Sequence, residues 1–407
     1  MPLPRFVAVL ALLLSPSGTS AQTVLTLDRV IELASTRNPQ VVQAATRETQ
    51  AAGRLADARV RLADNPSFDL FIGPRQRPAP LDALTDLELS VVQPFEIGGQ
   101  RGHRTNAATA LLTQRRAETA ALALDATATA VRAFYRALHA QQLRDIADDA
   151  LKVTDEMVRA AEARYEAGET AWLPVNLARV EQARAVRDRL EAVRLTQTAY
   201  GTLRAVLALS PDEALAVSGA WPSDEAPSLE ALIAAIPDRP DLAALVEAAA
   251  VAESERRLII ADQRPDIVAG LGVRREGGES SIGAKIGMSL PVFQRHDGAA
   301  AAAAARVAEA QTAGAAARQI YESRLRSAHA AYQAARESAA VLDQGVAPLL
   351  EENVGLAQES YAAGKIGLIE LLVVRRETVA ARREVLQSRL DLALALTEVR
   401  AAAGRFE

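Results

Sequence analysis

The sequence predicts a mainly α-helical protein built from two copies of one unit, each with a pair of short amphipathic strands. Three observations support this prediction: an internal repeat, long stretches without glycine or proline, and segments in which apolar and polar residues alternate. Hydrophobic residues make up 49% of the chain but aromatic residues only 4%, so alanine carries much of the apolar content. Alanine is the strongest helix former, and its small side chain lets helices pack closely.

An internal repeat divides the chain into two parts. The segments Tyr165-Glu-Ala-Gly168 and Tyr361-Ala-Ala-Gly364 lie 196 residues apart. Matching residues follow them at the same separation: Arg179 with Arg375, Glu181 with Glu377, Leu190 with Leu386 and Arg204 with Arg400. Upstream, Asn38-Pro39 matches Arg239-Pro240, and Asn65-Pro66 matches Arg264-Pro265. A repeat of this length duplicates a whole structural unit rather than a short solenoid module.

The first unit, residues 22–210, is expected to contain two strands, at about 66–73 and 86–95, followed by two long helices. Residues 103–167 contain neither glycine nor proline, which predicts a helix over about 100–167. Gly168 is expected to end it, and a return helix should cover 173–209. Apolar residues at spacings of three, four or seven indicate coiled-coil packing. They include Val131, Tyr135, Leu138, Val186, Leu190 and Leu203.

A proline-rich linker, residues 211–227, leads to the second unit, residues 228–404, and should lie away from both ends of the long helices. In the second unit the sequence predicts strands at about 266–274 and 281–291. A long helical arm over 298–363 and a return helix over 367–403 should follow. Because Pro348 cannot continue a helical hydrogen-bond ladder, we expect a kink or a break near it.

The N-terminus has the pattern of a secretory signal peptide over residues 1–21. Arg5 precedes an apolar run, residues 6–14, and small residues follow up to Ala21. The run is too short to span a bilayer, and no other segment approaches the roughly 18 apolar residues of a transmembrane helix. The chain contains no cysteine, so neither a disulfide framework nor an N-terminal lipid-modified cysteine is available. We therefore expect an exported protein.

Composition and motifs argue against nucleic-acid binding and catalysis. The formal charge of −5 gives no basic footprint for a nucleic acid. The four histidines, His103, His139, His296 and His329, are far apart in the sequence, which does not match the ligand spacing of a zinc site. No phosphate-binding loop and no nucleophile with a neighbouring base is apparent. We expect no catalytic residues, no metal site and no cofactor.

The predicted strands have the length and pattern of strands that cross an outer membrane. Leu87, Leu89 and Val91 alternate with Glu88 and Ser90. The same alternation runs through Phe68 to Ile72, Ile267 to Val273 and Ile282 to Leu290. About ten residues suffice for a tilted transmembrane strand, although amphipathic hairpins of a water-soluble domain would look similar. Four strands are too few to close a barrel, and open edges are not tolerated in lipid, so several chains must share one barrel.

The order of these features resembles the TolC family of outer-membrane efflux proteins, over residues 25–404. The matching stretches are Leu25-Thr-Leu-Asp-Arg-Val-Ile-Glu-Leu-Ala34, Asn38-Pro39, Gln93-Pro-Phe-Glu-Ile-Gly-Gly-Gln-Arg101, Leu290-Pro-Val-Phe-Gln-Arg-His-Asp-Gly298 and the two Tyr-x-x-Gly segments. The resemblance implies a homotrimer in which four strands per chain form a twelve-stranded barrel in the Gram-negative outer membrane. A periplasmic α-helical barrel would continue it. The stretch 93–101 is most similar to the CzcC-like branch, which serves heavy-metal pumps.

The resemblance also implies partners and sites. A periplasmic adaptor (membrane fusion protein) would dock at the tips of the helices and link the channel to an inner-membrane pump of the RND or ABC type. The matching tip positions are Tyr165, Gly168 and Glu169 in the first copy, and Tyr361, Gly364, Lys365, Ile366, Gly367 and Leu368 in the second. Glu370 matches a position of an acidic ring that narrows the periplasmic opening, whereas Val373 stands where a second acid often occurs. A simpler interpretation of Glu370 is an exposed acid favoured by the helix dipole.

Three functions therefore remain open from the sequence. The first is a passive channel of a tripartite efflux system that exports small solutes or metal cations. The second is the exit duct of a type I protein-secretion system, which the same scaffold could serve. The third is a structural periplasmic coiled-coil protein without a pore. A periplasmic adaptor is disfavoured, since it needs β-rich flanking domains for which little sequence is left.

Overall fold

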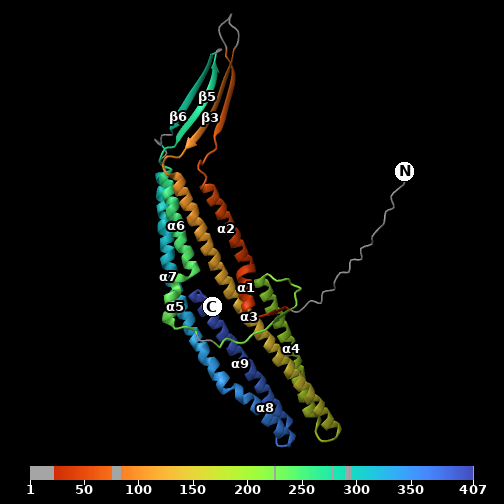
Figure 1. Ribbon diagram of the computed structural model, residues 1–407. Coiled ribbons are helices and arrows are strands. Elements are labelled where there is room, and N and C mark those ends of the chain that lie inside the picture. Colours follow the sequence, from red (N-terminus) through yellow and green to blue (C-terminus); the bar gives the residue numbers. More distant parts are fainter. Residues whose placement is uncertain are drawn as a thin grey trace, which may run out of the picture.

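The molecule is elongated, with a β-sheet at one end and two helical hairpins at the other (Figure 1). The computed structural model describes residues 23–75, 84–223, 226–276, 279–288, 293 and 295–406. The signal peptide predicted over 1–21 lies outside the described residues, as do residues 289–291 of the fourth predicted strand.

The first copy contains two short helices, a β-hairpin and two long helices. These are α1 (Leu27–Arg37), α2 (Pro39–Ala58), β2 (Ser67–Arg75), β3 (Leu84–Phe95), α3 (Gln100–Glu166) and α4 (Trp172–Leu207). The Asn38 side chain accepts a hydrogen bond from the Gln40 amide and so caps α2, whose first residue is Pro39. α4 begins two residues before Pro174, which is tolerated in the first turn because no helical hydrogen bond is lost there.

The second copy repeats this order with one interruption. Its elements are α5 (Leu229–Ala235), a 3-10 turn (Ile236–Asp238), α6 (Pro240–Ala261), β5 (Ile267–Glu276), β6 (Glu279–Met288), α7 (Asp297–Gly345), α8 (Ala347–Ala362) and α9 (Leu368–Ala403). The break predicted near Pro348 is present at Val346, where φ is −107° and ψ is −50°. The arm predicted as 298–363 is therefore two helices.

The linker between the copies contains a strand that the sequence did not predict. β4 (Leu215–Val217) pairs in parallel with β1 (Thr23–Leu25), and Leu215 and Val217 are buried in the main core. Three residues are too few to show an alternating pattern, which explains why this strand was missed. Figure 1 places the linker beside the middle of the helical body, away from the sheet and the helical tips.

The four longer strands form one antiparallel sheet in the order β2-β3-β5-β6. The register pairs Leu70 with Leu89, Leu89 with Val273, and Val273 with Ile282, so side chains of one kind share a face. The opposite face carries mainly polar residues and glycines, together with Phe71, Val92 and Val268. On it, Arg274 donates to Glu88 of the neighbouring strand at 2.8 Å. The alternation predicted for each strand thus extends across the sheet.

The core of the helical body lies at mid-length, where α1, α3, α4 and α9 meet. Val131, Phe134, Tyr135, Leu138, Leu203 and Leu207 are buried there. Toward the tip, alanines form the contact between α3 and α4: Ala178, Ala185 and Ala192 are buried. Val186 and Leu190, which have coiled-coil spacing in the sequence, do not lie in this contact, because both are exposed. Alanine seams bring helices close together, and the larger neighbours then point outward.

A buried arginine fastens the end of the chain to the second copy. Arg239 donates two hydrogen bonds to Asp241 and another to the carbonyl of Ala401 at the end of α9, at 2.9 Å. Its guanidinium also lies over the Tyr321 ring, 4.1 Å from the centroid. These contacts hold together the start of α6, α7 and the C-terminal end of α9.

Candidate functional site

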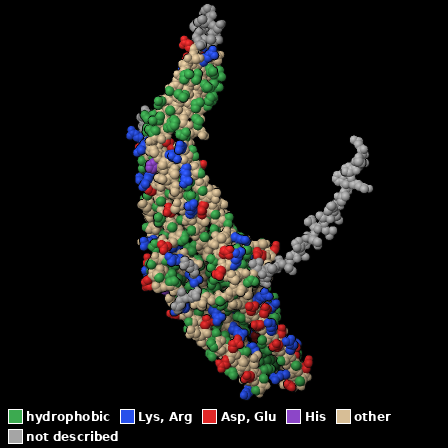
Figure 2. All heavy atoms as spheres, in the orientation of Figure 1, with side chains coloured by type: hydrophobic (Ala, Val, Ile, Leu, Met, Phe, Trp, Pro, Cys, Tyr) green, Lys and Arg blue, Asp and Glu red, His purple; other side chains and the backbone are tan. Residues whose placement is uncertain are grey.

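One face of the sheet is apolar and uncovered. Ile282, Ile286 and Leu271 are 82%, 81% and 69% exposed, and Phe68, Ile72 and Leu87 of the same face are also exposed. In Figure 2, hydrophobic side chains gather over the strand end of the molecule, whereas charged side chains are spread over the helices. A continuous apolar face of this kind is not stable in water and suits contact with lipid.

The sheet is also open at both sides. Within the described part of the chain, β2 pairs only with β3, and β6 pairs only with β5. The outer backbone groups of both strands need partners in a medium without water, because each unpaired group costs several kcal/mol there. The sheet is therefore an incomplete piece of a closed structure. Among the described helices, none is both long and apolar enough to span a bilayer.

Both helical tips are built on the same glycine-containing turn. Gly168 has φ of 75° and Gly364 has φ of 70°, in the left-handed region that favours glycine. In each tip the residue after glycine donates its amide to a carbonyl five residues back: Glu169 to Arg164 at 2.9 Å, and Lys365 to Ser360 at 2.8 Å. This hydrogen bond defines a Schellman turn, which satisfies carbonyls at the end of the helix.

The first tip also presents an aromatic side chain, Trp172, that the motif comparison did not select. Trp172 packs edge-on against Tyr165, with ring centroids 4.7 Å apart, and the Arg179 guanidinium lies over the Trp172 ring, 5.3 Å from its centroid. Tyr165 and Trp172 are 43% and 42% exposed, and the adjacent Leu173 is 63% exposed. The sequence did offer a signal for this surface, the apolar pair Trp172-Leu173 in the first turn of the return helix. Rigid aromatic anchors of this type are common at protein interfaces.

The two tips of one chain are in contact with each other. Arg164 of α3 donates to the hydroxyl of Tyr361 at 3.1 Å, and its guanidinium lies 5.0 Å from the centre of that ring. Leu368 packs against an apolar cluster of α3 and α4 that contains Val158 and Val175. Between the tips is a groove of 390 Å³, and Ile366, Gly367 and Glu370 are among its lining residues.

Glu370 lies in the first turn of α9 and is exposed. Its carboxylate bends back over Gly367, since a Cβ atom added at this glycine would lie 2.7 Å from Oε2. The position is favourable for a negative charge, because the amides of the first helical turn point toward it. The structure thus places Glu370 beside the second tip, together with the residues predicted for docking.

A second contact joins the two hairpins farther from the tips. Arg383 of α9 donates to Asp188 of α4 at 3.0 Å, and Arg187 donates to the same carboxylate at 2.5 Å. Partial burial alone would raise the pKa of Asp188, but the hydrogen bonds from Arg187 and Arg383 outweigh it and hold the pKa below its ordinary value. Asp188 therefore stays ionised and links the hairpins at neutral pH.

No group of three or more His, Asp or Glu side chains suited to a metal ion occurs among the residues that the structure describes. Near the junction of sheet and helices, burial and the neighbouring Glu96 raise the pKa of Asp262. His296, in the left-handed region before α7, acts in the opposite direction. Glu96 forms an ion pair with Arg104, and Gln100 donates a hydrogen bond to Asp266 at 2.9 Å.

An open sheet with an apolar face, continued by a long helical body, defines a subunit of a membrane channel. A family model described as "Outer membrane efflux protein" matches residues 30–209 and 232–405. The cobalt-zinc-cadmium resistance protein CzcC of Cupriavidus metallidurans is 28% identical over 90% of this chain and 89% of its own length. The nickel and cobalt resistance protein CnrC of the same organism is 31% identical over 76% of this chain and 73% of its own.

A crystal structure of CusC, from a study of its folding and transmembrane channel formation, superimposes with a TM-score of 0.74. It is 14% identical to the chain, and the match covers 93% of this chain and 92% of CusC. The chain belongs to the outer membrane efflux protein family, and the resemblance to TolC-like channels is confirmed. It is an efflux channel of the outer membrane that extends into the periplasm. The family and the fold are those of channel proteins rather than enzymes.

Proposed function

We propose that three copies of this chain form a passive duct through which an inner-membrane pump exports small solutes across the outer membrane. The observation that carries the proposal is the four-stranded sheet with an apolar face and two open edges. Three such sheets give a twelve-stranded barrel in which every edge is paired and the apolar face meets lipid. The polar face, with Glu88 and Arg274, then lines the lumen.

The two flanks of the helical body support ring closure. On one flank, Val186 and Leu190 of α4 are exposed; on the other, Val341, Leu349 and Leu356 of α7 and α8 are exposed. In Figure 1, α4 and α8 lie on opposite sides of the body, as β2 and β6 lie on opposite sides of the sheet. A heterologous contact between two different surfaces closes into a ring when the rotation fits. The helices then form a tube that continues the barrel.

The exposure and shape of the helical tips support the docking of a periplasmic adaptor there. The first tip offers Tyr165, Gly168 and Glu169 together with the exposed Trp172. The second offers Tyr361, Gly364, Ile366, Gly367 and Leu368 around the groove, and Lys365 in the adjoining turn. In this arrangement the turn glycines serve both the left-handed backbone and the close approach of a partner. An adaptor held there would connect the duct to a pump of the RND or ABC type.

Glu370 is the proposed gate residue. In a ring of three chains its exposed carboxylate would occur three times near the periplasmic opening and would attract cations. The Asp188–Arg383 ion pair and the Arg164–Tyr361 contact hold the second hairpin against the first, and we infer that they favour the narrow state. Widening of the opening would require these contacts to separate.

Heavy-metal cations are the substrates that we favour. The relatives CzcC and CnrC are named for resistance to cobalt, zinc, cadmium and nickel, and this chain matches CzcC over 90% of its length. An acidic ring at the entrance would suit cations. The alternative function, as the exit duct of a type I protein-secretion system, would require the same trimeric channel. A pore-free structural coiled coil leaves the apolar face of the sheet unexplained.

Purification of the mature protein in detergent tests the duct. We expect a complex with the mass of three chains that inserts into planar lipid bilayers and conducts ions. A water-soluble monomer without conductance would refute the proposal. The substrate is tested separately by deleting the gene and measuring sensitivity to cobalt, zinc and cadmium against sensitivity to drugs. Loss of drug resistance alone, with a conducting trimer, would refute only the choice of metals.

A further inference from the structure

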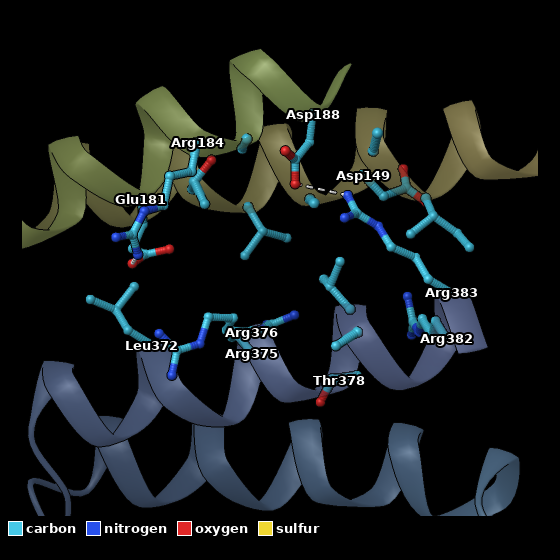
Figure 3. A pocket seen from close by; sticks show the side chains of 18 of the residues that line it. Asp149, Glu181, Arg184, Asp188, Leu372, Arg375, Arg376, Thr378, Arg382 and Arg383 are labelled. Atoms are coloured by element: carbon cyan, nitrogen blue, oxygen red, sulfur yellow. Dashed lines mark hydrogen bonds and ion pairs between the residues drawn. The ribbon is translucent and has the colours of Figure 1, made fainter. Parts of the chain in front are cut away.

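A cavity of 200 Å³ lies between the two hairpins of one chain, bounded by α3, α4, α8 and α9. Its wall is largely apolar and includes Ile146, Val153, Met157, Leu372 and Val379. Five arginines and three acids also line it: Arg184, Arg375, Arg376, Arg382, Arg383, Asp149, Glu181 and Asp188. Figure 3 shows these side chains reaching into the space between the helices. The lining therefore carries an excess of positive charge.

Four of the five arginines have a carboxylate partner. Arg184 pairs with Glu181 at 2.6 Å, Arg383 with Asp188 at 3.0 Å, Arg382 with Glu351 at 2.5 Å and Arg376 with Glu377 at 3.7 Å. Arg375 has no ion pair with a described residue, and its Nε is buried without a hydrogen-bond partner. A buried donor that lacks a partner costs about 1–3 kcal/mol, more when it is charged.

Comparison with the first copy of the repeat shows which contacts Arg375 lacks. Its counterpart in the first copy is Arg179, which donates to Glu162 at 2.7 Å and lies over the ring of Trp172. At the separation of 196 residues, Glu162 corresponds to Gln358 and Trp172 to Leu368. The second copy thus keeps the guanidinium but replaces both of the groups that neutralise and cover it. Arg375 faces the cavity instead.

The electrostatic setting of Arg375 favours an added anion. Burial, followed by repulsion from Arg382, lowers the pKa of Arg375, and Glu156 opposes this only in part. An anion in the cavity would relieve the repulsion and satisfy the free Nε. A carboxylate can accept two parallel hydrogen bonds from one guanidinium, and the apolar wall would then enclose the rest of the molecule.

We propose that this cavity binds a compact organic anion, a carboxylate attached to a small apolar group, with Arg375 as its principal contact. The ligand would bridge α9 and the first hairpin within one chain. All of the lining residues belong to one chain, and the proposal makes no assumption about what the channel transports.

Binding of benzoate to the purified full-length mature protein, measured by isothermal titration calorimetry, tests the proposal. We expect saturable binding that the neutral analogue benzamide does not reproduce, and weaker binding of inorganic phosphate, which gains nothing from the apolar wall. Arg375→Gln should weaken benzoate binding about tenfold or more, the effect of losing hydrogen bonds to a charged group. Arg375→Lys, which keeps the charge but not the paired geometry, should weaken binding less.

Arg389→Gln is the matched control. Arg389 lies on the same helix and is similarly exposed, but it pairs with Asp343 outside the cavity. Its substitution should leave benzoate binding unchanged. Absence of saturable benzoate binding to the unmodified protein would overturn the proposal, and so would equal binding by Arg375→Gln in a protein that keeps its native assembly and melting temperature.

Discussion

Replacing Asp188 by asparagine should loosen the second hairpin from the first and so favour a wider periplasmic opening. Asp188 lies on α4 and receives a hydrogen bond from Arg383 on α9 at 3.0 Å. Asparagine has nearly the same shape but no charge, so it removes the ion pair with little change in packing. Converting Arg383 to glutamine removes the same contact from the other side and should have the same effect.

The magnitude follows from the exposure of the pair. The side chains of Arg383 and Asp188 are 35% and 25% exposed, so solvent screens their attraction and one pair contributes about 0.5–1 kcal/mol. In a ring of three chains, three such pairs acting together would contribute about 1.5–3 kcal/mol. Their loss should shift the ratio of narrow to wide states by roughly 10- to 150-fold.

Single-channel recording in planar bilayers measures this shift as a larger fraction of time in the high-conductance state. The control is Glu191→Gln, because Glu191 pairs with Arg194 within α4 and does not touch the second hairpin. If Asp188→Asn and Arg383→Gln leave conductance unchanged, or if Glu191→Gln changes it equally, the two hairpins are not held by this ion pair.

Acidification should have the same effect as the substitution at Asp188. Since its pKa is held below the ordinary value of 3.8 in the narrow state, the contact contributes fully above about pH 4. The contribution is lost as the pH falls through the lowered pKa. The open fraction of the unmodified channel should therefore rise only below about pH 4, and the Asp188→Asn channel should lack that rise.

Three further predictions concern other parts of the chain. Glu370→Ala should raise conductance and weaken block by multivalent cations in planar bilayers; unchanged block would exclude Glu370 from the gate. Arg239→Gln leaves Asp241 without its buried partner and should lower the free energy of unfolding by about 3–5 kcal/mol. The measurement is the melting temperature, which should fall. A melting temperature within error of the unmodified protein would contradict this. Gly168→Ala should destabilise the first tip by about 1–2 kcal/mol, since its φ is 75°, and limited proteolysis should cut there faster than in a Gly53→Ala control.

The sheet was predictable because its residues follow a simple rule. In a strand exposed to lipid on one side, every second residue must be apolar, and Ile282, Ala284 and Ile286 obey this without reference to other strands. The long helix was predictable for a similar reason, since residues 103–167 contain no helix breaker. Because the chain is duplicated, each of these features occurs twice in the sequence, and the second occurrence supports the prediction made from the first.

Packing between helices was harder to predict. Val186 and Leu190 have coiled-coil spacing, yet the contact with α3 uses Ala185 and Ala192, one and two positions away. Sequence spacing gives the period of a seam but does not decide between two neighbouring stripes, of which one contacts α3 and the other is exposed. The inter-hairpin pair Asp188–Arg383 and the cavity beside Arg375 depend on distances between segments almost 200 residues apart, for which one sequence carries no signal.

The break at Val346 gives the two copies different mechanical properties. α3 is one continuous helix of 67 residues, whereas the corresponding arm of the second copy is divided between α7 and α8. Pro348 lacks the amide that would carry the hydrogen-bond ladder across this point, so bending there breaks few contacts. A force on the second tip can bend the second copy at Val346, while α3 of the first copy stays stiff along its whole length. In an assembled ring of chains, continuous and divided helical arms would alternate around the tube. The periplasmic opening could then change its diameter while the membrane end kept its shape.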